Sequence, residues 1–297
     1  MRNRLIGLAL LCVSLVLAQH SAVAFKLGSG KGQNSSANVA VPGGRSQLDV
    51  AYGNDPAQRM DVYYPERTTD APVIMMVHGG GWVIGDKQSS GVVSNKVAHW
   101  VPQGFVVISV GYRLAPAANA LEQARDVAKA LAFAQSKAKT WGADPSKFIL
   151  MGHSAGGHLV SLLASSPTLV SAAGAQPWLG TISLDSAALD VVARMKGVHQ
   201  SFFDQAFGKD PKAWSAASPI ECLSAAPKPM LLVCSSLRKD SCPQCDAFTI
   251  KARKFGGRVI VYPVSMSHRD INVKLGTPGA YTDKIDGFIN SLVMSSN

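Results

Sequence analysis

The residue pattern with the clearest chemical meaning is a serine between glycines, in the segment Gly152–Gly157 (Gly-His-Ser-Ala-Gly-Gly). Glycines two residues before and after Ser154 lack the Cβ atoms that would clash in a sharp strand-to-helix turn, and such a turn exposes its serine. The run from Lys147 to Met151 fits a short buried strand, and the residues after Gly157 fit a helix. We therefore predict that Ser154 is a nucleophile.

A serine hydroxyl needs a base to take its proton, and His268 is the best candidate. It lies between an expected strand, Arg258 to Tyr262, and the expected last helix, and in this kind of sheet the histidine comes last in the chain. The remaining histidines have other expected roles. His153 and His158 should point away from the hydroxyl, and His99 and His199 should lie at the surface or in packing contacts. His78 should order the segment that we call the glycine loop, residues 78–82.

The base works best when a carboxylate fixes its tautomer and stabilises its charged form. Asp240 follows the expected strand Met230 to Cys234 in a loop, where such a carboxylate should project, so we predict Asp240 as the acid. Three competitors are weaker: Asp246 should lie inside the next helix, Asp270 is too close in sequence to the histidine, and Asp185 should end a strand and cap the segment after it.

Acyl transfer also builds negative charge on the carbonyl oxygen, which fixed N–H donors stabilise. The backbone N–H of Ala155 is one expected donor by its position. The segment His78–Trp82 (His-Gly-Gly-Gly-Trp) follows another buried run, and Gly80 and Gly81 can bring their backbone close to a substrate. Which two of the three loop glycines donate is left open.

The elements around these residues alternate between apolar runs and helical patterns. Such alternation indicates a mostly parallel sheet covered on both faces. A hairpin is expected first, from Leu48–Tyr52 and Met60–Tyr64. The other expected strands cover residues 73–77, 105–110, 147–151, 180–184, 230–234 and 258–262, and the expected helices residues 91–101, 120–141, 243–255 and 281–293.

Between Asp185 and Pro219 the alternation stops, although the segment is too apolar for a solvated loop. We interpret residues 186–219 as a small helical lid over the carboxyl ends of the strands. The alternative is an ordinary crossover helix with a long loop, but about thirty-five residues exceed a normal connection between a strand and a helix.

Several motifs together resemble the α/β-hydrolase fold, and specifically the hormone-sensitive-lipase-like carboxylesterases. They are His78–Trp82, Gly111–Pro116 (Gly-Tyr-Arg-Leu-Ala-Pro), Gly152–Gly157 and His268 with Ile271-Asn272; Tyr52-Gly53, Met60–Pro65 and Phe207–Pro219 resemble the bacterial esterase and kynurenine-formamidase-like branch. The resemblance covers about residues 48–293. It implies Ser154, Asp240 and His268 as catalytic residues and Gly80, Gly81 and Ala155 as the oxyanion hole. The loop that holds Asp240 is longer than is common and lacks the usual glycine.

The N-terminus has the pattern of a secretory signal peptide over residues 1–24. Arg2 and Arg4 precede an apolar run from Leu5 to Leu17, and Ala22-Val23-Ala24 offers a cleavage site. A membrane anchor is the alternative, but the run is shorter than the roughly 20 residues that span a bilayer. Residues 25–47 are expected to be a flexible leader and residues 48–297 one hydrolase domain, in a periplasmic or secreted protein.

Charge and cysteine content indicate which binding partners and cross-links to expect. The 297 residues carry a net charge of +10, but the basic residues are scattered, so no nucleic-acid partner is expected, nor stable membrane insertion. Four cysteines remain after cleavage (Cys222, Cys234, Cys242 and Cys245), and export favours disulfides, with three pairings open. Cys242 and Cys245 also have the spacing of a redox motif, although thioredoxin-like chains place it early in a smaller fold.

Taken together, the sequence predicts an exported serine hydrolase that cleaves small or medium carboxylic esters through an acyl-enzyme, with no metal or cofactor. An amidase or formamidase on the same three residues is the first alternative. A binding protein with a vestigial hydrolase site is the second. The acyl group, the alcohol and the oligomeric state are left open.

Overall fold

The computed structural model describes residues 39–295, and a single eight-stranded sheet organises them in the order β1-β2-β4-β3-β5-β6-β7-β8. Strand β2 runs antiparallel to both its neighbours, and all other adjacent pairs are parallel. The strands are β1 (Gly44–Ala51), β2 (Arg59–Pro65), β3 (Ala71–Val77), β4 (Val106–Val110), β5 (Ala143–His153), β6 (Gly180–Leu184), β7 (Met230–Ser235) and β8 (Val259–Val264). This is the mostly parallel sheet that the apolar runs predicted.

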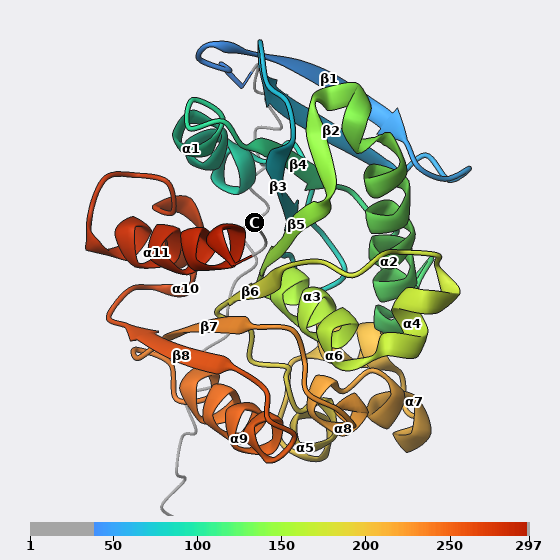
Figure 1. Cartoon of the computed structure of the whole chain (residues 1–297). Helices are drawn as coiled ribbons and strands as arrows, with labels where there is room; N and C mark the ends of the chain where they lie inside the picture. Colours follow the sequence, from blue (N-terminus) through green and yellow to red (C-terminus); the bar gives the residue numbers. More distant parts are fainter. Residues whose placement is uncertain (1–38, 296–297) are drawn as a thin grey trace, which may run out of the picture. The chain divides into compact units, whose positions relative to one another are not determined.

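Helices cover both faces of the sheet (Figure 1). One face packs against α1 (Ser90–Trp100), α10 (His268–Val273) and α11 (Ala280–Met294). The other packs against α2 (Ala120–Lys137), α3 (Ala155–Ser165) and α9 (Ser241–Lys254). Both faces of the central strands are therefore buried, which explains why these strands are mostly apolar.

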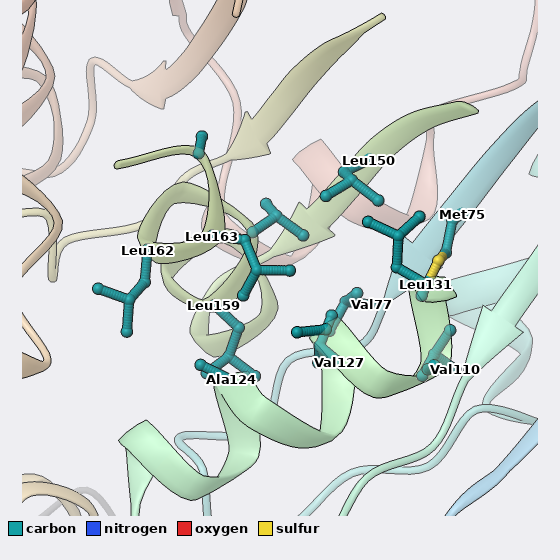
Figure 2. Packing of buried hydrophobic residues seen from close by; sticks show 14 of the residues in the cluster. Met75, Val77, Val110, Ala124, Val127, Leu131, Leu150, Leu159, Leu162 and Leu163 are labelled. Carbon is teal, nitrogen blue, oxygen red and sulfur yellow. The ribbon is translucent and has the colours of Figure 1, made fainter. Parts of the chain in front are cut away.

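Alternating side chains divide the core into two layers. Met75 and Val77 of β3 belong to the cluster under α2 and α3, whereas Ile74 and Met76 belong to the one under α1 and α11. Figure 2 shows Val127 of α2 and Leu159 of α3 in the first cluster. These contacts fix the position of α3, and therefore also the position of Ser154, which directly precedes the helix.

Between β6 and β7 the chain forms four short helices, as expected for the segment 186–219. They are α5 (Val191–Lys196), α6 (Ser201–Phe207), α7 (Pro211–Ala216) and α8 (Pro219–Cys222). Figure 1 shows them gathered on the side of the sheet that carries α3 and the small helix α4 (Pro167–Ala172). We call residues 186–222 the helical insert.

Some boundaries differ from the sequence prediction. Strand β1 begins at Gly44 and pairs with the end of β2, so residues 44–47 belong to the sheet and not to a leader. The helix expected over 120–141 ends at Lys137 and continues as a 3-10 turn, Ala138–Trp141. Helix α10 was not predicted. The expected signal peptide and most of the expected leader lie outside the described residues.

Within residues 39–295, no helix combines the length and the apolarity needed to cross a bilayer.

Candidate active site

Ser154 lies on a sharp turn between β5 and α3, as the glycine spacing predicted. Its backbone has φ +56° and ψ −118°, a strained conformation for a residue with a side chain. A Cβ at Gly152 would lie 2.2 Å from the carbonyl oxygen of Gly156, and a Cβ at Gly156 would lie 2.1 Å from that of Val77. Both glycines are thus required by close backbone contacts, and the turn holds the half-buried serine at the carboxyl end of the sheet.

The structure brings Ser154 and His268 together. The Oγ atom of Ser154 lies 3.0 Å from Nε2 of His268, the first residue of α10. The other ring nitrogen, Nδ1, lies 2.6 Å from Oδ2 of Asp185. Since an ionised carboxylate only accepts hydrogen bonds, Nδ1 carries the proton, and Nε2 is free to accept the proton of the serine.

Asp185, not Asp240, therefore occupies the position of the acid. It directly follows β6, the neighbour of β5 in the sheet, and its carboxylate is fully buried. Oδ1 accepts hydrogen bonds from the N–H of Ser235 at 2.8 Å and the hydroxyl of Ser241 at 2.5 Å. Burial alone would raise the pKa of Asp185, but the hydrogen bonds from His268, Ser241 and Ser235 hold that pKa well below its ordinary value.

The prediction of Asp240 as the partner of His268 is wrong. Asp240 precedes α9, and its carboxylate turns toward two arginines: Oδ2 lies 2.7 Å from Nη2 of Arg194, and Oδ1 lies 3.3 Å from Nη2 of Arg238. The long loop after β7 reaches the site through Arg238 and through the donors to Asp185. Asp185 does end a strand, as expected, but its side chain faces His268 and does not cap the helical insert.

The glycine loop after β3 lies directly beside the serine. A Cβ at Gly79 would lie 2.9 Å from the Cβ of Ser154. Gly80 and Gly81 have φ values of +126° and +59°, which glycine adopts without strain. Ala155 opens α3, so its N–H is one of the first-turn amides that no helical carbonyl accepts. That these three residues form an oxyanion hole stays a prediction.

Aromatic and histidine side chains hold this loop. His78 stacks on Tyr112 with ring centroids 4.3 Å apart, and its Nδ1 lies 2.8 Å from the carbonyl oxygen of Gly79. The indole N–H of Trp82 donates to Nδ1 of His158 at 3.2 Å, and Nε2–H of His158 donates to the carbonyl of Ala217 at 2.7 Å. Burial lowers the pKa of His158 to about 4, so the ring is neutral. His158 thus ties the glycine loop to the helical insert.

His153 contacts the backbone and the ring of His268, the candidate base, a contact that the sequence did not predict. Its Nε2–H donates to the carbonyl oxygen of His268 at 2.9 Å, and the two rings lie 4.5 Å apart. Burial, together with the charge of His268, lowers the pKa of His153 to about 3. His153 therefore stays neutral and positions the backbone of His268. His99 and His199 pair with Asp286 and Asp204, in keeping with surface roles.

Aromatic side chains of α6 line the insert side of the site. Phe203 and Phe207 lie within 5.3 and 4.8 Å of the Trp82 ring, centroid to centroid. A Cβ at Gly81 would lie 3.2 Å from the ring of Phe202. The insert thus borders the glycine loop; that it acts as a lid stays a prediction.

One disulfide joins Cys234 at the end of β7 to Cys242 at the start of α9. Cys222 and Cys245 are free, so the expected alternative of a Cys242–Cys245 redox pair is not formed. The disulfide closes the loop that contains both serine donors to Asp185, so it restrains the surroundings of that carboxylate.

A mostly parallel sheet covered on both faces, with a serine turn after β5, an aspartate after β6 and a histidine after β8, is the α/β-hydrolase fold. This confirms the fold class and the resemblance that the motifs indicated. The chain belongs to the BD-FAE family, whose model matches residues 60–247, more than half of the chain.

Three individual comparisons agree with this fold. Esterase LipC of Mycobacterium tuberculosis is 39% identical over 117 residues, which cover 38% of this chain and 28% of that protein. Kynurenine formamidase of Salmo salar is 33% identical over 119 residues, 40% of this chain and 38% of that one. The structure of Thermogutta terrifontis esterase 2 phosphonylated by sarin has a TM-score of 0.69 at 20% identity, covering 86% of this chain and 96% of the other. The chain spans less than half the length of these two curated relatives.

Proposed function

We propose that the protein is a serine carboxylesterase in which Ser154, His268 and Asp185 form the catalytic triad. The observation that carries this proposal is the pair of contacts at the histidine ring, 3.0 Å to the serine hydroxyl and 2.6 Å to the aspartate carboxylate. These are the contacts that a base and its orienting acid need.

In the proposed reaction Ser154 Oγ attacks the ester carbonyl carbon while its proton passes to Nε2 of His268. The tetrahedral oxyanion is stabilised by the backbone N–H groups of Ala155 and the glycine loop. Collapse breaks the bond to the alcohol oxygen, which takes the proton from His268 and leaves an acyl-serine. Water, deprotonated by the same nitrogen, then attacks the acyl-serine and returns the serine and a carboxylic acid.

The named relatives support an ester substrate. LipC is called an esterase, and the Thermogutta protein is an esterase in a form phosphonylated by sarin. Phosphonylation is the reaction that an activated serine undergoes with an organophosphorus compound, so it offers a direct test.

The test is to incubate the purified chain with a fluorophosphonate probe, locate the adduct by mass spectrometry and assay p-nitrophenyl esters of increasing acyl length. We expect labelling at Ser154 and hydrolysis of the short esters, both lost in Ser154→Ala. A folded protein with neither label nor turnover would favour a binding protein with a vestigial site. Hydrolysis by Ser154→Ala would refute the proposed nucleophile.

An amidase or formamidase activity is the second candidate, and the similarity to kynurenine formamidase favours it. The same triad serves both reactions, which differ in how the leaving group is protonated by His268. Comparing kcat/KM for a formate ester and an N-formyl arylamine with the same aryl group separates the two. An amide preferred over the matched ester would make formamidase the better description.

We further propose that the protein is exported to an oxidising compartment, the periplasm or the medium. The Cys234–Cys242 disulfide supports this, because disulfides persist where thiols are not kept reduced. Expression of the full chain in a bacterial host, followed by fractionation and N-terminal sequencing, tests it. We expect a mature protein that begins near Phe25 outside the cytoplasm; an uncleaved chain in the cytoplasm would contradict export.

A further inference from the structure

A fourth side chain, that of Arg238, reaches the triad. Its Nη1 lies 2.8 Å from Oδ2 of Asp185, 3.3 Å from the carbonyl oxygen of the same residue and 2.9 Å from Nδ1 of His268. The side chain is 29% exposed, so it is partly shielded from solvent. A guanidinium group thus shares the carboxylate oxygen that orients the proposed base.

The other edge of this guanidinium is paired as well. Nη2 of Arg238 lies 3.3 Å from Oδ1 of Asp240, and Oδ2 of Asp240 lies 2.7 Å from Nη2 of Arg194 on α5. Arg194 also lies over the ring of Phe203, 5.5 Å from its centroid. Charges of alternating sign therefore run from the buried acid to the helical insert.

We propose that Arg238 is a positioning residue, which holds the carboxylate of Asp185 against His268 and sets the lower pH limit of the reaction, while Asp240 moderates its charge. The proposal rests on the triad of the proposed function. It gives Asp240 a role near the site, although not the one that the sequence predicted.

Arg238 acts on the site in two ways, through hydrogen bonds and through its charge. First, Oδ2 accepts from both the imidazole and the guanidinium, and Oδ1 from Ser235 and Ser241, so the carboxylate cannot rotate without breaking hydrogen bonds. Second, a positive charge 2.9 Å from Nδ1 opposes a second positive charge on the imidazole.

Other ionisable groups face His268, and the variants below leave them unchanged. His153 packs against its ring and is neutral, because burial lowers the pKa of His153 to about 3. Further charged or ionisable groups interact with His153, Asp185, Arg238 or Asp240, or lie on the same helix as His268: Lys96, Arg194, Cys245, Arg269, Asp270 and Tyr281.

The experiment measures kcat and KM of the purified chain from pH 4 to 9 with a p-nitrophenyl ester, for wild type, Arg238→Met, Arg238→Lys and Asp240→Asn. In Arg238→Met, we expect the pH of half-maximal kcat/KM on the acid side to rise by about one unit and kcat to fall about tenfold. Arg238→Lys keeps the charge but not the forked geometry, so the acid side should stay near wild type while kcat falls.

Asp240→Asn should shift the acid side of the kcat/KM profile in the direction opposite to that of Arg238→Met. Removing its negative charge leaves Arg238 less compensated, so the acid limb should move to lower pH. The shift should be smaller than half a unit, because Asp240 is 39% exposed and solvent screens its charge. If the loop had only a structural role, Arg238→Met and Asp240→Asn would not shift the acid side of the kcat/KM profile in opposite directions.

Arg45→Met is the matched control, because Arg45 pairs with an exposed carboxylate, that of Glu66 near β1 and β2. An Arg238→Met profile that coincides with that of Arg45→Met overturns the proposal. If Arg238→Met does not fold, a wild-type-like or raised acid limb in Asp240→Asn overturns it instead. Fluorophosphonate labelling at Ser154 is measured on every variant. Absence of label in wild type itself would mean that the proposed function fails, independently of Arg238.

Discussion

At the scale of single residues, the choice between two aspartates is the sharpest test of the site. Asp185→Asn leaves a donor or a misplaced acceptor opposite Nδ1, which favours the wrong tautomer of His268, and we expect kcat to fall by about 10³ to 10⁴. Asp240→Asn should change kcat less than tenfold at neutral pH. Steady-state kinetics on a p-nitrophenyl ester compare the two, and an Asp240→Asn loss equal to that of Asp185→Asn would restore Asp240 as the acid.

Phe202 supports a second residue-scale prediction, about acyl-chain length. Its half-buried ring borders Gly81 of the glycine loop and the Phe203 ring, 4.6 Å away centroid to centroid. Removing the ring opens space beside the glycine loop, so Phe202→Ala should raise kcat/KM for octanoate relative to acetate p-nitrophenyl esters by about tenfold. Phe255→Ala, which removes an exposed ring after α9, is the control. An unchanged octanoate-to-acetate ratio would place the acyl chain elsewhere.

At the scale of elements, the local pattern around each strand predicted most of the sheet, whereas contacts between strands decide which aspartate lies against His268. Ser154 and His268 could be found because a glycine turn and a final strand-to-helix junction are local signals. Asp185 follows β6 just as Asp240 follows β7, so sequence offers both. The difference is tertiary: the carbonyl of Leu184 accepts the N–H of Ser154 at 2.9 Å, which brings the end of β6 against the serine turn.

The loop between β7 and α9 allows a prediction about the Cys234–Cys242 disulfide. The cross-link closes a short loop with a sequence separation of 8, and loop-closure entropy then gives about 2 kcal/mol of stability. In the double variant Cys234→Ala/Cys242→Ala, we expect the free energy of unfolding in urea to fall by about that amount. Activity should fall too, because Ser235 and Ser241 hold Asp185 from this loop.

Cys222→Ser is the matched control for that element, since Cys222 is free and lies in α8. Its urea unfolding curve should match that of wild type in the absence of a reducing agent, and again in its presence. If reduction left the wild-type unfolding curve unchanged, the disulfide would not stabilise the loop.

At the scale of the whole molecule, three buried bases contribute to the pH dependence of stability. The pKa of His153 is lowered to about 3, that of His158 to about 4 and that of Lys96 to about 7, with burial as the first cause in each case. Lys96 is 1% exposed, and the hydrogen bonds of its Nζ within residues 39–295 go to oxygens of Gly91 and Asn272. When the chain folds, each base either loses its proton or remains a charged group in the protein interior.

The sign is the same for all three. Where the unfolded chain binds a proton that the folded chain does not, stability rises with pH. For the histidines this window runs from their lowered pKa values to about 6.5, and for Lys96 it runs from about 7 to about 10.4. The protein should therefore lose stability as the pH falls below 6.5, and gain it as the pH rises above 7 until other groups titrate.

Urea unfolding at pH 7 and pH 5 measures the acid part of this behaviour. Each buried histidine should contribute a loss of about 2 kcal/mol between the two values, since pH 5 lies about 1.5 units below the unfolded pKa. His158→Gln, which removes one of the two titrations, should lose about 2 kcal/mol less than wild type over the same interval, whatever its stability at pH 7. Equal losses in wild type and variant would mean that His158 is protonated in the folded protein, and the Trp82–His158–Ala217 link would then need a different hydrogen-bond direction.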